Sequence, residues 1–119
     1  MLLNLSNHLS DQWGKAQRQN AIAQYGKIED LPFPTIAPQN SSEEIQKLAI
    51  NYCQRIVALQ PQAVHLMGEM TFTFTLVRLL QKQRISCIAS TSQRKVVAEE
   101  NGQKTVLFEF EQFREYPKA

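Results

Sequence analysis

The sequence lacks the short motifs that mark the best-known metal and nucleotide sites. It has two cysteines, Cys53 and Cys87, with no Cys or His partner at ligand spacing, which argues against zinc and favours ordinary buried thiols. It contains neither G-x-G-x-x-G nor G-x-x-x-x-G-K-[ST], so dehydrogenases and mononucleotide kinases of those classes are disfavoured. It also lacks H-E-x-x-H, C-x-x-C and any triad pattern. We therefore expect no metal and no cofactor.

The chain is also poor in excess charge and in long apolar runs. Its formal net charge is only +2, which does not describe a protein that coats nucleic acid, so we expect no long nucleic-acid partner. No apolar run approaches the ~18 residues that span a bilayer, and the first ten residues do not resemble a signal peptide. We expect a cytoplasmic protein without a membrane partner. A chain of 119 residues suits a single domain, residues 1–119.

The first third of the chain indicates two strands and a helix. Residues 1–5, MLLNL, form a short apolar run that predicts a buried strand. A partial apolar stripe from Ser10 to Tyr25, followed by Gly26, predicts a helix. Residues 27–31 can form a short strand. The next segment, PFPTIAP, carries three prolines that forbid a strand ladder and favour a loop.

The middle of the chain predicts two more helices around a buried strand. Ser41 and Glu44 are spaced as a capping box at the start of an apolar stripe that runs to Pro61. Residues 63–67, AVHLM, predict a strand that is buried on both faces. Residues 70–82 predict a helix, although residues 71–75 also alternate like a strand; the crossover length favours the helix.

The last third predicts strands only. Residues 85–89, ISCIA, indicate another buried strand, and the pair Asn101-Gly102 between two β-type runs predicts an antiparallel hairpin over residues 94–112. The order of elements predicts an α/β fold: a small Rossmann-like, mostly parallel sheet flanked by helices, with a C-terminal antiparallel β-hairpin.

Three polar segments follow predicted strands of this sheet. In such sheets ligands bind beyond the carboxyl ends of the strands, near the point where strand order reverses, and free N–H groups at helix starts favour anions. A phosphate-bearing ligand is therefore the natural candidate. The segments are Ser6, Asn7 and His8; Gly68, Glu69, Met70 and Thr71; and Ser90, Thr91, Ser92 and Arg94.

Each of these residues also has a structural interpretation. Ser, Asn and Thr at strand ends often only cap helices and turns, and Glu69 can complement a helix dipole instead of accepting hydrogen bonds from a ribose or a base. Arg94 can bind a phosphate or lie as a solvated charge. His65, inside an apolar strand, is interpreted as a packed core histidine, whereas His8 lies in a polar loop where it can grip a phosphate or move a proton.

Five segments of the chain resemble a known family. They are NLSNHLSDQW, DLPFPTIAP, VHLMGEMTFTF, ISCIASTSQR and FEFEQFREY, and together they are similar to small Csx-type accessory proteins encoded beside type III CRISPR systems. The resemblance implies a compact CARF-like relative of the Rossmann fold that acts on cyclic oligoadenylate, the second messenger of those systems. Cyclic tetra-adenylate is the ring size that it favours.

The resemblance implies a binding protein that sequesters the messenger and dampens antiviral signalling. The alternative is a metal-independent ring nuclease, in which a 2′-hydroxyl attacks the neighbouring phosphate and His8 and Arg94 are the candidate catalytic residues. A third alternative is an interaction module whose FEFEQF segment forms an exposed sheet edge. A ring with four phosphates is symmetric, so we expect a homodimer that presents its loops twice, with stacking of dimers around the ligand as a further expectation.

Overall fold

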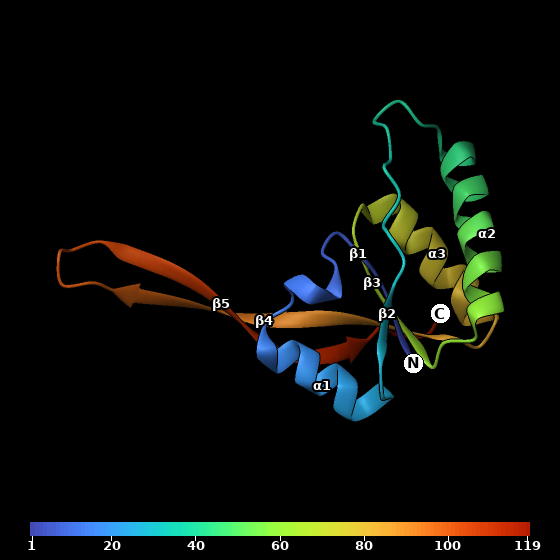
Figure 1. The fold of residues 1–119 in the computed structure, drawn as a ribbon. Helices are drawn as coiled ribbons and strands as arrows, with labels where there is room; N and C mark the ends of the chain where they lie inside the picture. The colour runs from blue at the N-terminus through green and yellow to red at the C-terminus, as the bar shows by residue number, and fades with distance from the viewer.

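The structure is a computed structural model that describes residues 1–119. One mixed sheet of five strands lies at its centre, in the order β2-β1-β3-β4-β5 (Figure 1). The strands are β1 (Leu2–Ser6), β2 (Ile28–Asp30), β3 (Ala63–Met67), β4 (Ser86–Ala98) and β5 (Lys104–Glu115). The first four are parallel and β5 pairs antiparallel with β4. The predicted fold class, α/β with a mostly parallel sheet and a C-terminal hairpin, is confirmed.

Helices cover both faces of the sheet (Figure 1). They are the short 3₁₀ helix η1 (Ser10–Gln12) and the α-helices α1 (Lys15–Tyr25), α2 (Ser42–Leu59) and α3 (Met70–Lys82). Helices α2 and α3 share the larger apolar core with one face of the sheet, and η1 and α1 pack on the opposite face over a smaller core. The region 71–75, ambiguous in sequence, is helical because residues 70–82 bury an apolar face against the sheet.

The helix ends follow the local chemistry of the sequence. The Ser41 side chain accepts a hydrogen bond from the Glu44 amide, and the Glu44 carboxylate accepts one from the Ser41 amide, which completes the predicted capping box of α2. Helix α1 ends at Gly26, whose φ of +84° suits a residue without a Cβ. The predicted helix from Ser10 is interrupted between η1 and α1, around Trp13 and Gly14.

Alternating side chains of β1 serve two different environments. Leu3 and Leu5 point into the larger core beneath α2 and α3, while Leu2 belongs to the smaller core beneath α1. Because successive strand residues point to opposite faces, Asn4 and Ser6 share the α1 face with Leu2. Both are buried, so this face changes from apolar to polar toward the carboxyl end of the strand.

The fourth strand is longer than the sequence indicated. Residues 85–89 were expected to form a separate strand, followed by a polar segment and a hairpin from residue 94, but β4 continues without a break to Ala98. Its parallel pairing with β3 ends at Ile88, and antiparallel pairing with β5 carries it onward, with a bulge between Thr91 and Ser92. The predicted hairpin itself is confirmed, with Gly102 at φ +81° in its turn.

The distal part of this hairpin leaves the body of the molecule. We call residues 92–110 the arm; Figure 1 shows it extending away from the helices. The radius of gyration is 16.2 Å, against about 13.5 Å for a compact domain of this length, so the arm makes the molecule elongated. Among the helices, none is long and apolar enough to cross a membrane.

Candidate functional site

A cavity of about 350 Å³ opens at the carboxyl ends of the central strands. Strand order reverses between β1 and β3, since the chain continues from β1 to β2 on one side and from β3 to β4 on the other. This is the position at which open α/β sheets bind ligands. The lining residues are Ser6, Asn7, His8, Trp13, Gln17, His65, Met67, Gly68 and Ser90. We call it the switch-point cavity.

The Asn4 side chain organises the floor beside this cavity. Its Nδ2 donates to the His8 carbonyl oxygen at 2.8 Å and to the Asp30 carboxylate at 2.8 Å. Its Oδ1 lies 2.8 Å from the Ser6 hydroxyl and 2.9 Å from the His65 Nδ1. A single amide thus connects three strands and the loop after β1, and this loop carries the residues at the cavity rim.

Asp30 anchors the other end of this network. Its carboxylate accepts hydrogen bonds from the Ser10 amide at 2.9 Å and the Ser10 hydroxyl at 2.8 Å, besides the one from Asn4. Burial alone would raise the pKa of Asp30, but the hydrogen bonds from Asn4 and Ser10 and the Arg18 guanidinium together lower that pKa. Asp30 is therefore a carboxylate at neutral pH, and it holds the start of η1 against β2.

His65 is the one ionisable side chain in the floor of the cavity that is almost fully buried, with 2% of its surface exposed. Its ring packs in an edge-to-face contact with Trp13, with centroids 4.9 Å apart and an interplanar angle of 68°, and its centroid lies 5.7 Å from that of the Phe113 ring. Burial lowers the pKa of His65 to about 4, so the ring is neutral at physiological pH. Its Nε2 is buried and has no hydrogen-bond partner. The interpretation of His65 as a core histidine is confirmed as far as burial is concerned. It did not include the ring nitrogen that lacks a hydrogen-bond partner.

Gly68 adjoins the cavity for a steric reason. A Cβ at this position would lie 2.3 Å from the Phe33 ring, which comes from the proline-rich loop after β2. That ring in turn packs against Phe72 in α3, with centroids 5.3 Å apart. The glycine therefore lets the loop cross directly over the end of β3.

The predicted residues after β3 diverge from one another. Gly68 lines the switch-point cavity, but Met70 lines a different, apolar cavity and is 83% exposed. Glu69 and Thr71 border a third cavity near the proline-rich loop. The structure therefore places one of these four residues at the switch-point cavity.

Glu69 acts as the N-cap of α3. Its carboxylate accepts hydrogen bonds from the Thr71 hydroxyl and from the amides of Thr71 and Phe72, and these bonds lower the pKa of Glu69. The free N–H groups that were expected to attract a ligand anion at this helix start are thus occupied by a carboxylate of the chain itself. A phosphate close to Glu69 would meet a like charge.

The predicted residues beyond Ser90 also lie away from the cavity. Thr91, Ser92 and Arg94 are inside β4, where the Thr91 hydroxyl bonds to the backbone of Gln112 and Arg94 pairs with Phe108 on the arm. At about 3.3 Å per residue, Arg94 lies roughly 13 Å along the strand from Ser90. Because β4 does not turn after Ala89, these residues do not converge with the loops after β1 and β3.

Ser90 does reach the cavity, together with Met67. The amide and the hydroxyl of Ser90 lie 3.3 Å and 3.2 Å from the Met67 sulfur. A thioether is a weak hydrogen-bond acceptor on a flexible side chain. This wall of the cavity is consequently held by weak contacts, in contrast to the Asn4 network on the opposite side.

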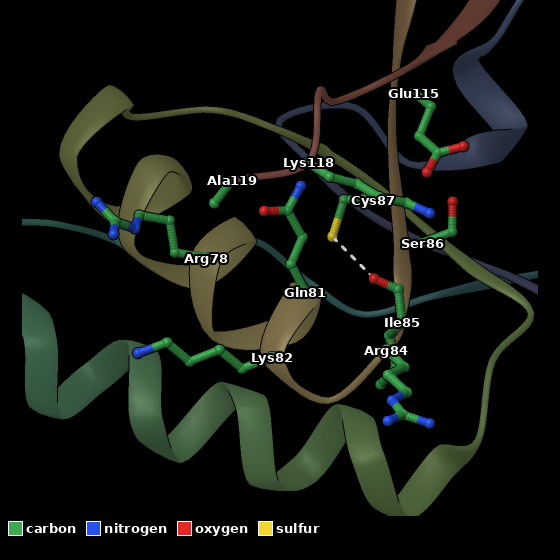
Figure 2. Close-up of a pocket in the computed structure, with 10 residues that line it drawn as sticks. All are labelled: Arg78, Gln81, Lys82, Arg84, Ile85, Ser86, Cys87, Glu115, Lys118 and Ala119. Carbon is green, nitrogen blue, oxygen red and sulfur yellow. Dashed lines mark hydrogen bonds between the residues drawn. The ribbon is translucent and has the colours of Figure 1, made fainter.

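A larger cavity, of about 520 Å³, lies near the amino end of β4 and is lined by several cationic side chains. Figure 2 shows that the charged ends of Arg78, Lys82 and Arg84 lie apart and do not point toward a common centre, so they do not converge on one anion. Arg78 instead lies over the Phe74 ring, 5.5 Å from its centroid. Cys87 in its wall is unreactive, because burial, followed by the charges of Cys53 and Glu115, raises the pKa of the thiol to about 12.

The switch-point cavity also includes residues that the sequence did not single out as site residues. Trp13 lies directly after η1 and Gln17 lies in α1, and the position of both depends on how those helices pack on the sheet. Asp30 lies outside the cavity but orients Asn4. One signal was available: Asn4, Ser6 and His65 are polar residues inside otherwise apolar strands, and buried polar groups need partners.

Comparisons with known proteins give one match. The model of a family described as the uncharacterized protein MJ1673 family matches residues 1–114. No curated protein and no solved structure matches the chain.

Proposed function

We propose that this chain, which belongs to the uncharacterized protein MJ1673 family, binds cyclic oligoadenylate in the switch-point cavity and lowers the concentration of free messenger. The family description names no activity. The choice of ligand comes from the sequence resemblance to small Csx-type accessory proteins of type III CRISPR systems, with cyclic tetra-adenylate as the expected ring. A CARF-like role in dampening the antiviral signal follows from the same resemblance.

The observation that carries this proposal is the convergence of distant segments on one cavity. The end of β1 and the loop after it bring Ser6, Asn7 and His8, Gly68 follows the end of β3, and β4 adds Ser90. These groups offer hydroxyl, amide and imidazole contacts, while Trp13 supplies an aromatic surface of the kind on which bases stack. Hydrogen-bonding rims around a partly aromatic cavity are typical of small-ligand sites.

The size of the cavity supports a dimeric form of the complex. At about 350 Å³ it is at the small end of ligand sites and has room for one nucleotide unit of a ring of four. A ring of four units is bound more completely when a second copy offers the same cavity across a two-fold axis. The proposed complex is therefore a homodimer around one ring, and stacking of such dimers would extend it.

Calorimetric titration with cyclic tetra-adenylate tests the proposal. We expect saturable binding, and a loss of about ten-fold or more in affinity for Asn7→Ala combined with His8→Ala, since two contacts of about 1 kcal/mol each are removed. Ser92→Ala is the matched control: Ser92 carries a hydroxyl on the arm, outside the cavity. Absence of binding at millimolar ligand, or equal losses in both variants, would refute the site.

The alternative, a ring nuclease, is separated from sequestration by one further measurement. Excess labelled cyclic tetra-adenylate is incubated with the protein, which is then denatured. Sequestration returns the intact ring, whereas a metal-independent nuclease gives multiple turnovers and linear products with 2′,3′-cyclic phosphate ends. His8 lines the cavity and Arg94 of the same chain does not, so loss of turnover on Arg94→Ala would require the arm of a second copy.

A further inference from the structure

We propose that His65 Nε2 accepts a hydrogen bond from a neutral donor of the bound ligand, either a ribose hydroxyl or the exocyclic amine of adenine. His65 is thereby the residue that makes the switch-point cavity read the nucleoside part of a nucleotide and exclude its phosphate from the cavity floor. This inference rests on the proposed function for the identity of the ligand, and the experiment below separates the two.

The hydrogen-bond network fixes which nitrogen of His65 carries the proton. Asn4 Nδ2 faces two groups that can only accept, the His8 carbonyl and the Asp30 carboxylate, so the amide cannot be turned over. Asn4 Oδ1 therefore faces His65, and Nδ1 must donate to it across 2.9 Å. In a neutral imidazole the other nitrogen, Nε2, is then an acceptor with a free lone pair.

A free acceptor in this position selects the chemistry of its partner. A phosphate diester offers only acceptor oxygens, and a lone pair beside them is repulsive. A hydroxyl or an amino group can donate to Nε2, and this bond would satisfy a buried polar atom that otherwise has no partner. The phosphates of a nucleotide must then lie toward the exposed rim, where Asn7 and His8 are found.

Access to Nε2 requires a small local movement, because the atom is shielded from solvent. Met67 lines the same cavity and is 36% exposed. Its side chain takes part in hydrogen bonding only through its sulfur, which accepts from Ser90. Its unbranched side chain can change rotamer at little cost. Trp13 packs edge-on against the imidazole and stays in place to flank the entering group.

The other buried polar atom without a partner provides a comparison. Thr73 Oγ1 belongs to α3, on the opposite face of the sheet, and borders the apolar cavity of Met70 and Phe74. Substitution to valine replaces its hydroxyl with a methyl group of the same shape. Thr73→Val is therefore a matched control that removes an unpartnered buried polar atom far from His65.

Two substitutions at His65 separate its nitrogens. In His65→Asn the side-chain amide nitrogen can take the place of Nδ1 and keep the bond to Asn4, while the acceptor at Nε2 is lost. In His65→Gln the amide reaches the place of Nε2 and its oxygen restores an acceptor. We expect His65→Asn to weaken binding of cyclic tetra-adenylate about ten-fold, His65→Gln to weaken it less, and Thr73→Val to leave it unchanged.

Nitrogen NMR of the His65 ring tests the contact in the unmodified protein. The probes are 3′,5′-cyclic AMP, its 2′-deoxy form, its analogue without the 6-amino group, and inorganic phosphate. Each organic probe keeps the same phosphate diester, and the parent nucleotide has only the 2′-hydroxyl free on its ribose. We expect the parent to shift the Nε2 resonance, phosphate alone to leave it unchanged, and one of the two analogues to lose the effect, which identifies the donor.

The outcomes distinguish the two proposals. If cyclic tetra-adenylate binds by calorimetry without shifting Nε2 and without a loss in His65→Asn, the proposed function stands and the role of His65 is refuted. If cyclic tetra-adenylate does not bind but the parent mononucleotide shifts Nε2, the role of His65 stands and the messenger is wrong. If inorganic phosphate shifts Nε2 as strongly as the nucleotide, or no probe shifts it, the inference is overturned.

Discussion

The floor of the switch-point cavity and the arm are two extremes of the same sheet. At the floor, Asn4 and His65 are almost completely buried and the Asn4 amide uses both its donor and its acceptor. On the arm, Phe108 is 70% exposed and Val96 51%, and the ion pair of Lys95 and Glu109, 2.8 Å apart, is open to water. Polar residues are thus buried in the body, while apolar residues are exposed on the arm.

This difference shows where stability and interaction reside in the molecule. A two-stranded ribbon without a covering layer is marginally stable in water, whereas a satisfied buried network fixes one arrangement of its strands. The arm adds little to the folding free energy of a single copy, and the body supplies most of it. Measurements that treat the two regions separately can test this division.

The largest effect expected concerns the pH dependence set by His65. Its pKa is 6.5 in an unfolded chain and about 4 in the folded protein, so between these values the unfolded state binds a proton that the folded state does not. Stability is therefore fully present above pH 6.5 and falls as pH decreases toward 4, by about 3 kcal/mol. Urea unfolding at half-unit pH steps measures this slope.

His65→Asn is the control for the pH experiment, because it removes the titrating ring. The loss of stability between pH 6.5 and 4.5 should disappear in that variant. Asp30, whose pKa is lowered from 3.8, contributes its own loss only at lower pH, as it becomes protonated in the folded state. An unchanged slope in His65→Asn would show that another group governs this window.

A smaller effect is expected at the crossing of the proline-rich loop over β3. Gly68→Ala places a methyl group against the Phe33 ring and should cost about 2 kcal/mol through overpacking. Gly14→Ala is the matched control, since a Cβ at Gly14 meets nothing within 4 Å and its φ is −65°. Thermal unfolding of both variants compares them directly. Equal stabilities would mean that the ring moves aside freely.

The smallest effect is expected on the arm. Phe108→Ser changes a side chain that is mostly exposed, so the free energy of unfolding should change by less than about 0.5 kcal/mol. The measurement is urea unfolding at two protein concentrations ten-fold apart. A cost above 1 kcal/mol that grows with concentration would break the comparison, because it would show the arm buried against another copy.

Local sequence chemistry was sufficient for most of the fold. The capping box at Ser41, the prolines after β2 and the Asn101-Gly102 turn each depend on near neighbours, and all three are confirmed. The predicted end of the fourth strand was wrong, because the continuation of β4 depends on its pairing with β5, about twenty residues away in sequence. Thr91, Ser92 and Arg94 were consequently expected beyond the end of that strand, whereas they lie inside β4.

The candidate site was predictable in position and less so in its members. Residues directly after β1 reach the cavity because a strand end fixes where the next two or three residues lie. The contact of Trp13 with the cavity depends on helix packing. The unpartnered Nε2 of His65 depends on the direction of hydrogen bonds among four elements. Neither property has a period or a spacing in sequence, so only the three-dimensional arrangement reveals them.

Strand β2 has only three residues, and yet it determines whether the cavity floor accepts or donates hydrogen bonds. Asp30, its last residue, and the His8 carbonyl are what keep the Asn4 amide from rotating by half a turn. With that rotation the amide nitrogen would face His65, the proton would move to the other ring nitrogen, and the floor would donate instead of accept. The direction of hydrogen bonding at the centre of the sheet is thus set by a carboxylate on its edge strand, which does not itself line the cavity.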